Sequence, residues 1–285
     1  MSIPSNPVLQ DIILQGMKEG GQYTVTSSSQ AYTDFKAYQW ETIKTEIWNA
    51  SRVDPLLETQ SCLVAAAGLS NMAVTLPTDF DSEISVVLYD ADESFRGVAQ
   101  AGGSSNTLTL AADFSSTNED MLGRYIFAIG GSGVAQHRQI IAYSDSTKVA
   151  YLDEVWTTAT GASTSYLVGV TTRELLRRDY QRPGTSRLPT FYSRVGSKLY
   201  VYPAADKVYP LILTYYANLT RLDDAGTVFT KHLRERRHLW VQGVKVKTME
   251  RYDDERRVQE KAIWDKMLAQ YGAQNPTYTQ LEGFR

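Results

Sequence analysis

The stretch Gly130 to Ile140, GGSGVAQHRQI, has the residue types of a phosphate-binding loop, with three glycines in four positions ahead of a histidine and an arginine. A dinucleotide fingerprint needs a third glycine where Gln136 stands. A Walker loop needs a lysine and a hydroxyl residue before a helix, whereas the strand-like run HRQIIAY follows here. The glycines therefore predict a turn with positive φ between two strands, and no nucleotide site.

The other polar residues do not converge on a catalytic or metal site. His232 and His238 are six positions apart and His137 is distant, so the histidines do not share one helical face at i and i+4. Paired catalytic carboxyls usually come from separate elements that face one cleft. Adjacent acidic pairs therefore predict solvated turns, or for the last pair the acidic first turn of a helix. These pairs are Asp153-Glu154, Asp223-Asp224 and Asp253-Asp254. The sequence predicts no enzyme, no cofactor and no metal.

A local excess of positive charge is the one polar pattern in the sequence that could indicate a binding surface. From Thr171 to Lys198 there are seven basic and two acidic residues, a local excess of five (7 − 2), and a second cluster, KHLRERRH, opens a predicted helix. Such runs form either a solvated face or a surface for nucleic-acid phosphates or an acidic partner. The residues that could face DNA or a partner are Arg177, Arg178, Arg182, Arg187, Arg234 and Arg237.

Composition sets limits on the class of protein. The 285 residues carry a net charge of −3, so no global attraction to nucleic acid is expected, and 18 tyrosines with 5 tryptophans suit strands and interfaces. A single cysteine, Cys62, excludes an internal disulfide, fits a reducing cytoplasm and predicts a packing role in a helix. Since the chain has neither a signal-peptide pattern nor an apolar run of about eighteen residues, we expect a soluble protein without a membrane partner.

Hydrophobic periodicity predicts helices at both ends of the chain. An amphipathic piece over 7–18 precedes the linker-like run GGQYTVTSSSQ. A helix is expected over 32–50 with Thr33 as its N-cap, and a second one opens at Pro55 and closes near Gly68. Two closing helices, about 230–252 and 253–271, are expected to join at RYDDERR.

The middle of the chain predicts strands. Strand formers flank the turn from Pro77 to Asp81, and five short strand-like runs between Gly97 and Val168 predict a small barrel or sandwich. The run TTRELLRR predicts a short helix. The segment KLYVYPAADKVYPLILTYYANL predicts a hairpin that can pair with the strands before the insert.

Together these elements predict an α+β fold. N- and C-terminal helices form a bundle with a small antiparallel sheet, and an all-β barrel or sandwich module is inserted. The expected domains are an N-terminal arm (1–31), a discontinuous helical and β core (32–96 and 169–272), the inserted module (97–168) and an extended C-terminal tail (273–285).

Several pieces in a fixed order carry a resemblance to a known family. LPTDF is followed by PTFYSRVGSKLYVYPAAD, then LTYYANL, a helix with HLWVQGVKVK, and the helix YDDERRVQEKAIWDKML. This order resembles the head-to-tail adaptor proteins of tailed bacteriophages, also described as connector or head-completion proteins. The module resembles a β module of phage structural proteins with a turn of the type GTGAGQ-x-R-x-I. Gly131, Gly133, Gln136, Arg138 and Ile140 match that turn, and Val134 departs from it.

The resemblance implies a virion structural protein at the neck between head and tail, assembled in the host cytoplasm. It implies a homo-oligomeric ring of twelve copies under the portal protein, with tail tube, nozzle or tail-fibre proteins on another face and phage DNA in the lumen. The C-terminal tail would contact the portal through Tyr278, Leu281, Phe284 and Arg285. Two alternatives stay open: another tail or decoration protein whose β module binds a glycan or a virion surface, and a cell-wall hydrolase.

Overall fold

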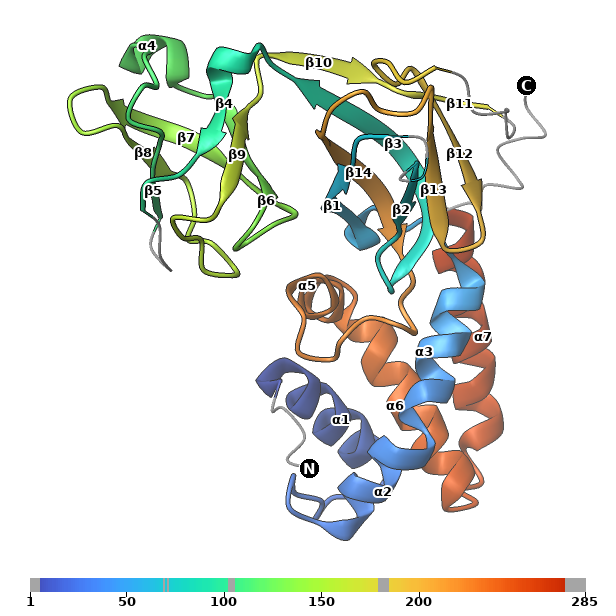
Figure 1. Ribbon diagram of the computed structural model, residues 1–285. Coiled ribbons are helices and arrows are strands. Elements are labelled where there is room, and N and C mark those ends of the chain that lie inside the picture. Colours follow the sequence, from blue (N-terminus) through green and yellow to red (C-terminus); the bar gives the residue numbers. More distant parts are fainter. Residues whose placement is uncertain (1–5, 69, 71, 102–105, 179–184, 275–285) are drawn as a thin grey trace. The chain divides into compact units, whose positions relative to one another are not determined.

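The computed structural model describes residues 6–68, 70, 72–101, 106–178 and 185–274. Helices and antiparallel sheets both contribute, which confirms the predicted α+β class (Figure 1). The chain divides into two compact units. We name them the helical unit (1–59, 78–82 and 215–285) and the β unit (60–77 and 83–214).

Both ends of the chain build the helical unit, as the sequence predicts. Helix α6 contacts α1, α3, α5 and α7, and three tryptophans, Trp40, Trp240 and Trp264, are fully buried in the core. Gly16 permits the contact between α1 and α6, since a Cβ on it would lie 2.5 Å from the Cβ of Val244. The helices are α1 (Pro7–Glu19), α2 (Gln30–Tyr38), α3 (Trp40–Ala50), α5 (Thr227–Glu235), α6 (Arg237–Arg251) and α7 (Arg257–Gln274).

The helix boundaries differ from the expectation at four places. Ser29 rather than Thr33 caps α2, and the predicted helix over 32–50 is divided at Gln39. The predicted helix over 230–252 is divided at Arg236, where the backbone leaves helical geometry (φ −107°, ψ 25°). The last helix begins at Arg257 because Asp253 has a positive φ of 53° and belongs to the preceding turn.

Two four-stranded sheets form part of the β unit. The first has the order β1 (Glu58–Ala65), β14 (Tyr209–Ala217), β3 (Phe80–Asp90) and β10 (Thr171–Glu174). The second has the order β11 (Leu176–Arg177), β12 (Phe191–Val195), β13 (Lys198–Tyr202) and β2 (Ala73–Thr75). β11 pairs with β12 in parallel, and β13 pairs antiparallel with both β12 and β2.

Two predicted helices are wrong. Pro55 to Gly68 forms the short 3-10 helix η1 (Pro55–Leu57) and then the edge strand β1, and TTRELLRR forms β10 and β11. In both segments pairing with a neighbouring strand overrides local helix propensity: β1 flanks the buried strand β14, and β10 pairs with β3. Cys62 therefore lies in a strand. Burial raises the pKa of its thiol to about 12, so it is not an activated nucleophile.

The predicted hairpin between β13 and β14 is also wrong, because its two arms lie in different sheets. β14 is buried along nearly its whole length and lies between β1 and β3. The hairpin partner of β13 is β12, through a turn in which Gly196 has a φ of +60°. The arms do pair with strands that precede the insert, as expected, since β14 lies beside β3 and β13 beside β2.

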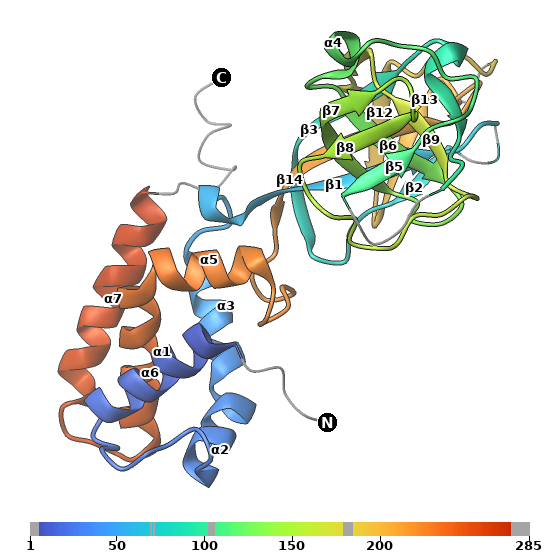
Figure 2. The same ribbon diagram turned by 90° about the vertical axis from the view of Figure 1, so that its left-hand side faces the viewer.

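A six-stranded sheet occupies residues 96–168 and curls on itself (Figure 2). A bridge between Ala101 and Thr109 joins the regions of its two edge strands, and its concave side holds a core of its own that includes Phe114, Trp156 and Tyr166. The strand order is β4 (Arg96–Val98), β9 (Ser165–Val168), β6 (Tyr125–Gly130), β7 (Gln136–Ser144), β8 (Val149–Leu152) and β5 (Thr107–Thr109), with α4 (Asn118–Met121) between β5 and β6. We call this segment the β module, and its boundaries at 97 and 168 stay a prediction.

Candidate functional site

The glycine-rich stretch forms the turn between β6 and β7, as predicted. The two strands pair antiparallel from Tyr125 with Gln139 to Ala128 with Gln136. Gly131 and Gly133 have φ values of +71° and +73°, which glycine adopts at low cost. A Cβ on Gly131 would lie 1.9 Å from the Ser163 carbonyl oxygen, so a neighbouring loop closes over the turn.

The polar residues after these glycines hold the loop at 155–158. The Gln136 side chain donates to the carbonyl oxygens of Gly133 (2.8 Å) and Thr158 (3.0 Å) and accepts the Thr158 N–H (2.9 Å). The Arg138 guanidinium donates to the Val155 carbonyl oxygen through Nε (3.0 Å) and Nη2 (2.7 Å). The residues that match the phage module turn therefore serve the internal structure of the β module.

The candidate arginines of the β unit make different contacts. Arg177 and Arg194 both pair with the nearly buried carboxylate of Glu83, at 2.6 and 3.4 Å. The guanidinium of Arg178 lies 3.8 Å from the centre of the Phe191 ring. Arg187 is exposed, and its backbone N–H donates to the Ala204 carbonyl oxygen. One buried carboxylate between two arginines leaves a local excess of positive charge.

Five predicted site residues lie outside the described residues. They are Arg182 and the proposed portal contacts Tyr278, Leu281, Phe284 and Arg285.

Arg234 and Arg237 lie together in the helical unit, in an open groove of about 550 Å³ where α5 ends and α6 begins. The Arg237 guanidinium donates to the Gln15 side chain (2.8 Å). Two glutamates balance the two arginines, so the groove is mixed in charge. Its lining is completed by residues of α1, α5, α6 and α7: Gln15, Glu19, Glu235, His238, Val241, Gln242 and Met267.

The chemically most elaborate cluster of the helical unit surrounds Asp54, which is fully buried. Its carboxylate accepts hydrogen bonds from the Tyr271 hydroxyl (2.8 Å) and from Arg236 Nε (3.0 Å) and Nη2 (3.3 Å). The Leu56 backbone N–H also donates (2.9 Å), and His232 Nε2 lies 3.4 Å away. Burial by itself would raise the pKa of Asp54, but these hydrogen bonds outweigh it and hold that pKa well below its usual range.

The tautomer of His232 follows from its partners. The Trp240 indole N–H can only donate, and it donates to Nδ1 of His232 at 3.1 Å. The ring proton therefore belongs to Nε2, which faces Tyr271 and Asp54. Both ring nitrogens are engaged inside the bundle and the side chain is fully buried. The cluster thus fixes η1, α5, α6 and α7 relative to one another.

Sequence reasoning missed this cluster because its members come from four separate elements. The spacing of His232, Arg236 and Trp240, at i, i+4 and i+8, would place these groups on one face of a continuous helix, although the structure divides that helix at Arg236. That spacing is a signal the sequence offers, although it does not reveal Asp54 or Tyr271 as partners.

Asp153-Glu154 and Asp223-Asp224 lie in turns, as expected, but the prediction that Asp253-Asp254 forms the acidic first turn of a helix is wrong, because α7 begins only at Arg257. Asp153 accepts the Gln139 and Glu154 N–H groups, and Asp223 accepts the Ala225 N–H. Asp254 lies before α7 and binds the backbone and guanidinium of Arg256, which lowers its pKa to about 2. Local hydrogen bonds account for Asp153, Asp223 and Asp254, whereas Asp224 forms ion pairs with Lys44 of α3 (3.2 Å) and Lys36 of α2 (3.8 Å).

Across the described ranges, no group of three or more His, Cys, Asp or Glu side chains could hold a metal ion. A helix long and apolar enough to cross a membrane is likewise absent from the part of the chain that the structure describes.

The comparison with protein families gives one match. Residues 147–281, from the turn before β8 to beyond α7, match the model of the family described as SU10 adaptor protein. The curated proteins contain no match to the chain. The family match covers just under half of the 285 residues and supports a phage adaptor-type structural protein, hence a virion component. At that level it confirms the resemblance seen in the sequence.

Proposed function

We propose that this protein is a head-to-tail adaptor: a ring-forming subunit that joins the portal to the tail and continues the DNA channel. The observation that carries the proposal is the family match over 147–281, which includes the order of β12, β13, β14 and the closing helices. The proposed module at 97–168 and the predicted core and tail boundaries are part of the proposal. Its role is structural, with no catalytic step.

The tested chain should end at Gln274, because α7 continues to that residue and Tyr271 binds Asp54. If residues 275–285 dock on the portal, particles made with this shortened chain will keep their portal and lose the adaptor. The contacts expected to be lost are those of Tyr278, Leu281, Phe284 and Arg285. An exposed-site control, Ser146→Ala in the β module, should leave adaptor content unchanged. Normal adaptor content in the shortened chain would argue against a C-terminal portal contact.

Electron microscopy of the native particle tests the location and the copy number together. A twelve-fold density at the neck is the expected result. Density for this chain at the tail tip or on the capsid surface would favour a tail or decoration protein instead.

The basic residues supply a separate test of the DNA channel. Each protein charge that neutralises a phosphate adds about 0.9 to the slope of log affinity against log salt. The double variant Arg234→Ala, Arg237→Ala should therefore lower that slope by about two if both face DNA in the ring. An unchanged slope would assign these arginines to a protein partner or to solvent.

A further inference from the structure

A small polar pocket opens in the helical unit where Arg236 divides α5 from α6. Its volume is about 130 Å³, and we call it the Arg236 pocket. The last turns of α7 form its other wall. The lining includes Arg236, His238, Met267, Gln270, Tyr271 and Gln274, and none of the described residues that line it is acidic. His238 and Met267 also line the open groove of about 550 Å³ that holds Arg234 and Arg237, so the two hollows adjoin.

The guanidinium group of Arg236 is held in a fixed position by Asp54. Nε and Nη2 donate to the Asp54 carboxylate at 3.0 and 3.3 Å, and the guanidinium carbon lies 5.6 Å from the centre of the Tyr271 ring. Asp54 is fully buried, whereas the Arg236 side chain is 27% exposed. A guanidinium has five N–H donors, and Nη1 forms no hydrogen bond with any described residue. These remaining donors can bind an acceptor in the pocket with little further loss of conformational freedom.

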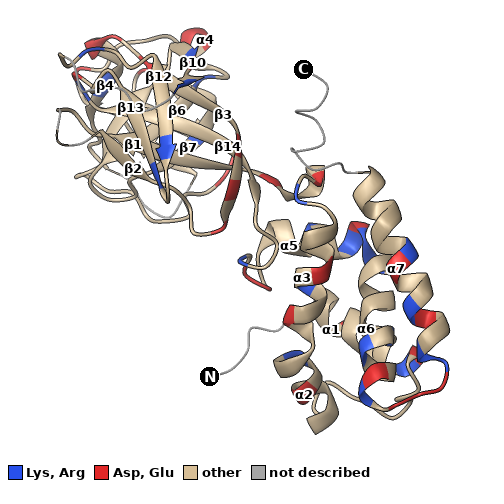
Figure 3. Ribbon diagram, turned by 90° about the vertical axis from the view of Figure 1, so that its right-hand side faces the viewer, with Lys and Arg blue, Asp and Glu red and all other residues tan. Residues whose placement is uncertain are grey.

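Helix α7 adds uncharged hydrogen-bonding groups to the pocket. Gln270 and Gln274 are four positions apart, so both side chains lie on one face of the helix. Neither side chain forms a hydrogen bond with another described residue. From Met267 to Gln274 the helix carries no charged residue, and its last turns are accordingly tan in Figure 3. This wall therefore offers amide N–H donors and no negative charge that would repel an anion.

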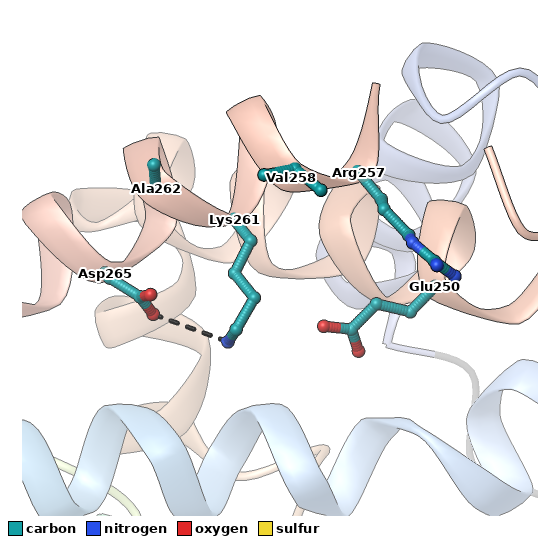
Figure 4. A pocket seen from close by; sticks show the side chains of 6 residues that line it. All are labelled: Glu250, Arg257, Val258, Lys261, Ala262 and Asp265. Carbon is teal, nitrogen blue, oxygen red and sulfur yellow. Dashed lines mark ion pairs between the residues drawn. The ribbon is translucent and has the colours of Figure 1, made fainter. Parts of the chain in front are cut away.

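A second groove of the helical unit, along α6 and α7, has a different character. Its volume is about 440 Å³, and Figure 4 shows that the Lys261 ammonium in it points at the Asp265 carboxylate. Glu250 of the same groove pairs with Lys247. These charges have partners inside the chain, so this groove does not call for a charged ligand. The Arg236 pocket is the better candidate for an ionic contact.

Resting on the adaptor function proposed above, we propose that the Arg236 pocket binds the carboxylate of an acidic side chain from another protein of the virion. The carboxylate accepts hydrogen bonds from Nη1 of Arg236 and from the amide groups of Gln270 and Gln274. Hydrogen bonds between a guanidinium and a carboxylate are charge-assisted and therefore stronger than neutral ones. Residues next to the acidic one lie in the adjoining groove, over Val241 and Met267.

The same surroundings favour a protein segment over DNA. Glu19 and Glu235 line the adjoining groove, where they would repel a continuous row of phosphates but can pair with a basic residue of a partner. A pocket of about 130 Å³ also admits a side chain rather than the backbone of a duplex. The mixed charge of the groove thus agrees with a partner segment that carries both signs of charge.

A titration of the full chain tests the pocket directly. The probe is N-acetylglutamyl-leucine amide, which carries one carboxylate and one apolar side chain, and the control ligand is its glutaminyl analogue. We expect the probe to shift the side-chain amide signals of Gln270 and Gln274 in ¹H–¹⁵N spectra. The uncharged analogue should bind at least about tenfold more weakly, because it cannot form a charge-assisted pair with Arg236.

Two glutamine variants on α7 locate the binding. Gln270→Glu places a like charge in the pocket and should weaken binding of the probe at least about tenfold. Gln259→Glu adds the same charge to an exposed position near the start of the helix and should leave binding unchanged. Both positions are exposed, so both variants should keep the circular dichroism spectrum of the wild type. Arg236 itself is left in place, since it also holds Asp54.

Competition decides between a carboxylate and a phosphate. If inorganic phosphate or a short DNA duplex displaces the probe at a lower concentration than acetate does, the site is a phosphate site and the proposal is overturned. The absence of binding, or equal binding to wild type and Gln270→Glu, would overturn it as well. The titration uses the isolated chain, so these outcomes do not depend on where the chain lies in the particle. Electron microscopy tests that position, and a chain absent from the neck would overturn the adaptor function instead.

Discussion

The hydroxyl of Tyr271 donates a 2.8 Å hydrogen bond to the carboxylate of Asp54, across 217 positions of sequence. Both side chains are buried. The bond ties the last turns of α7 to the segment through which the chain leaves the N-terminal helices. The C-terminal helix and the start of β1 are therefore fixed by the same carboxylate.

Removing this carboxylate should destabilise the helical unit. Asp54→Ala leaves Arg236 and Tyr271 without their partner, and breaking a buried ion pair costs about 3–5 kcal/mol. Since Arg236 is partly exposed, we expect the lower end, about 3 kcal/mol. Tyr271→Phe removes two buried hydrogen bonds, to Asp54 and from His232 Nε2, and should cost about 2 kcal/mol. Urea unfolding followed by helical circular dichroism measures both.

The exposed Asp265 provides the matched control for that experiment. Asp265→Ala removes a carboxylate of the same type from the solvent side of α7, where solvent screens its pair with Lys261. Its unfolding curve should match that of the wild type. A comparable loss in both variants would contradict the central role assigned to Asp54.

The same pair predicts how stability depends on pH. The pKa of Asp54 is lower in the folded chain than in the unfolded chain, so its contribution is complete above about pH 4 and is lost as pH falls further. Burial and the Asp54 charge raise the pKa of Tyr271, so its contribution is complete below about pH 10 and is lost as pH rises further. Asp54→Asn should flatten the acid limb, and Tyr271→Phe should reduce the alkaline limb, of stability measured from pH 2 to 11.

Gly131 should tolerate no side chain. Gly131→Ala combines a left-handed backbone with a contact to the Ser163 carbonyl oxygen, and we expect a loss of at least about 2 kcal/mol. Gly196 has a similar φ, but a Cβ added there would meet nothing within 4 Å. Gly196→Ala should therefore cost only about 1 kcal/mol. Equal losses in thermal unfolding would show that backbone strain alone decides the effect.

Arg138 should control the order of the loop it binds. Arg138→Lys cannot keep both donors on the Val155 carbonyl oxygen, so the loop should open more often. We expect the Thr158 amide, which donates to Gln136, to exchange its hydrogen roughly tenfold faster. Arg173→Lys, on the exposed strand β10, is the control and should leave this exchange rate unchanged.

The β module should be removable at a cost. Asp90 and Thr171 are directly paired in β3 and β10, so an Asn-Gly turn can replace residues 91–170. Phe127 and Leu167 of the module pack against Cys62 and Ile212, and the deletion uncovers these two side chains. We expect the shortened chain to keep its helical circular dichroism but to be less soluble.

A second version of that deletion, with Cys62→Ser and Ile212→Thr, should recover solubility. If neither version folds, the module belongs to the core of the β unit rather than to a separable insertion.

The sequence predicted those features that depend on local periodicity. α1, α3 and α6 follow from apolar residues at helical spacing, and the turn at Gly131 and Gly133 follows from glycine chemistry. β1 was missed because CLVAAAG suits a helix as well as a strand, and only the position beside β14 decides between them. The hairpin was wrong for a related reason: two strands that follow each other closely in the sequence need not pair when each has other neighbours.

The candidate site residues also differ in whether they depend on local sequence or on tertiary packing. The sequence selected Arg234 and Arg237 because a cluster of charges is visible in the sequence, and the structure places both in one groove where α5 ends and α6 begins; their role stays a prediction. The cluster around Asp54 could not be predicted from the sequence, because residues 54, 232, 236 and 271 come together only in the folded chain. Contacts at such sequence separation depend on the packing of the whole bundle.

The arrangement of the two units along the chain also constrains the order in which they form during synthesis. Apart from the short piece 78–82, the β unit is one continuous segment that ends at residue 214. The core of the helical unit joins α1 and α3 to α6 and α7, so its first helices have no partners until the last seventy or so residues emerge. The ribosome thus releases a chain whose β unit can already be folded, whereas the helical unit is completed only when translation is finished.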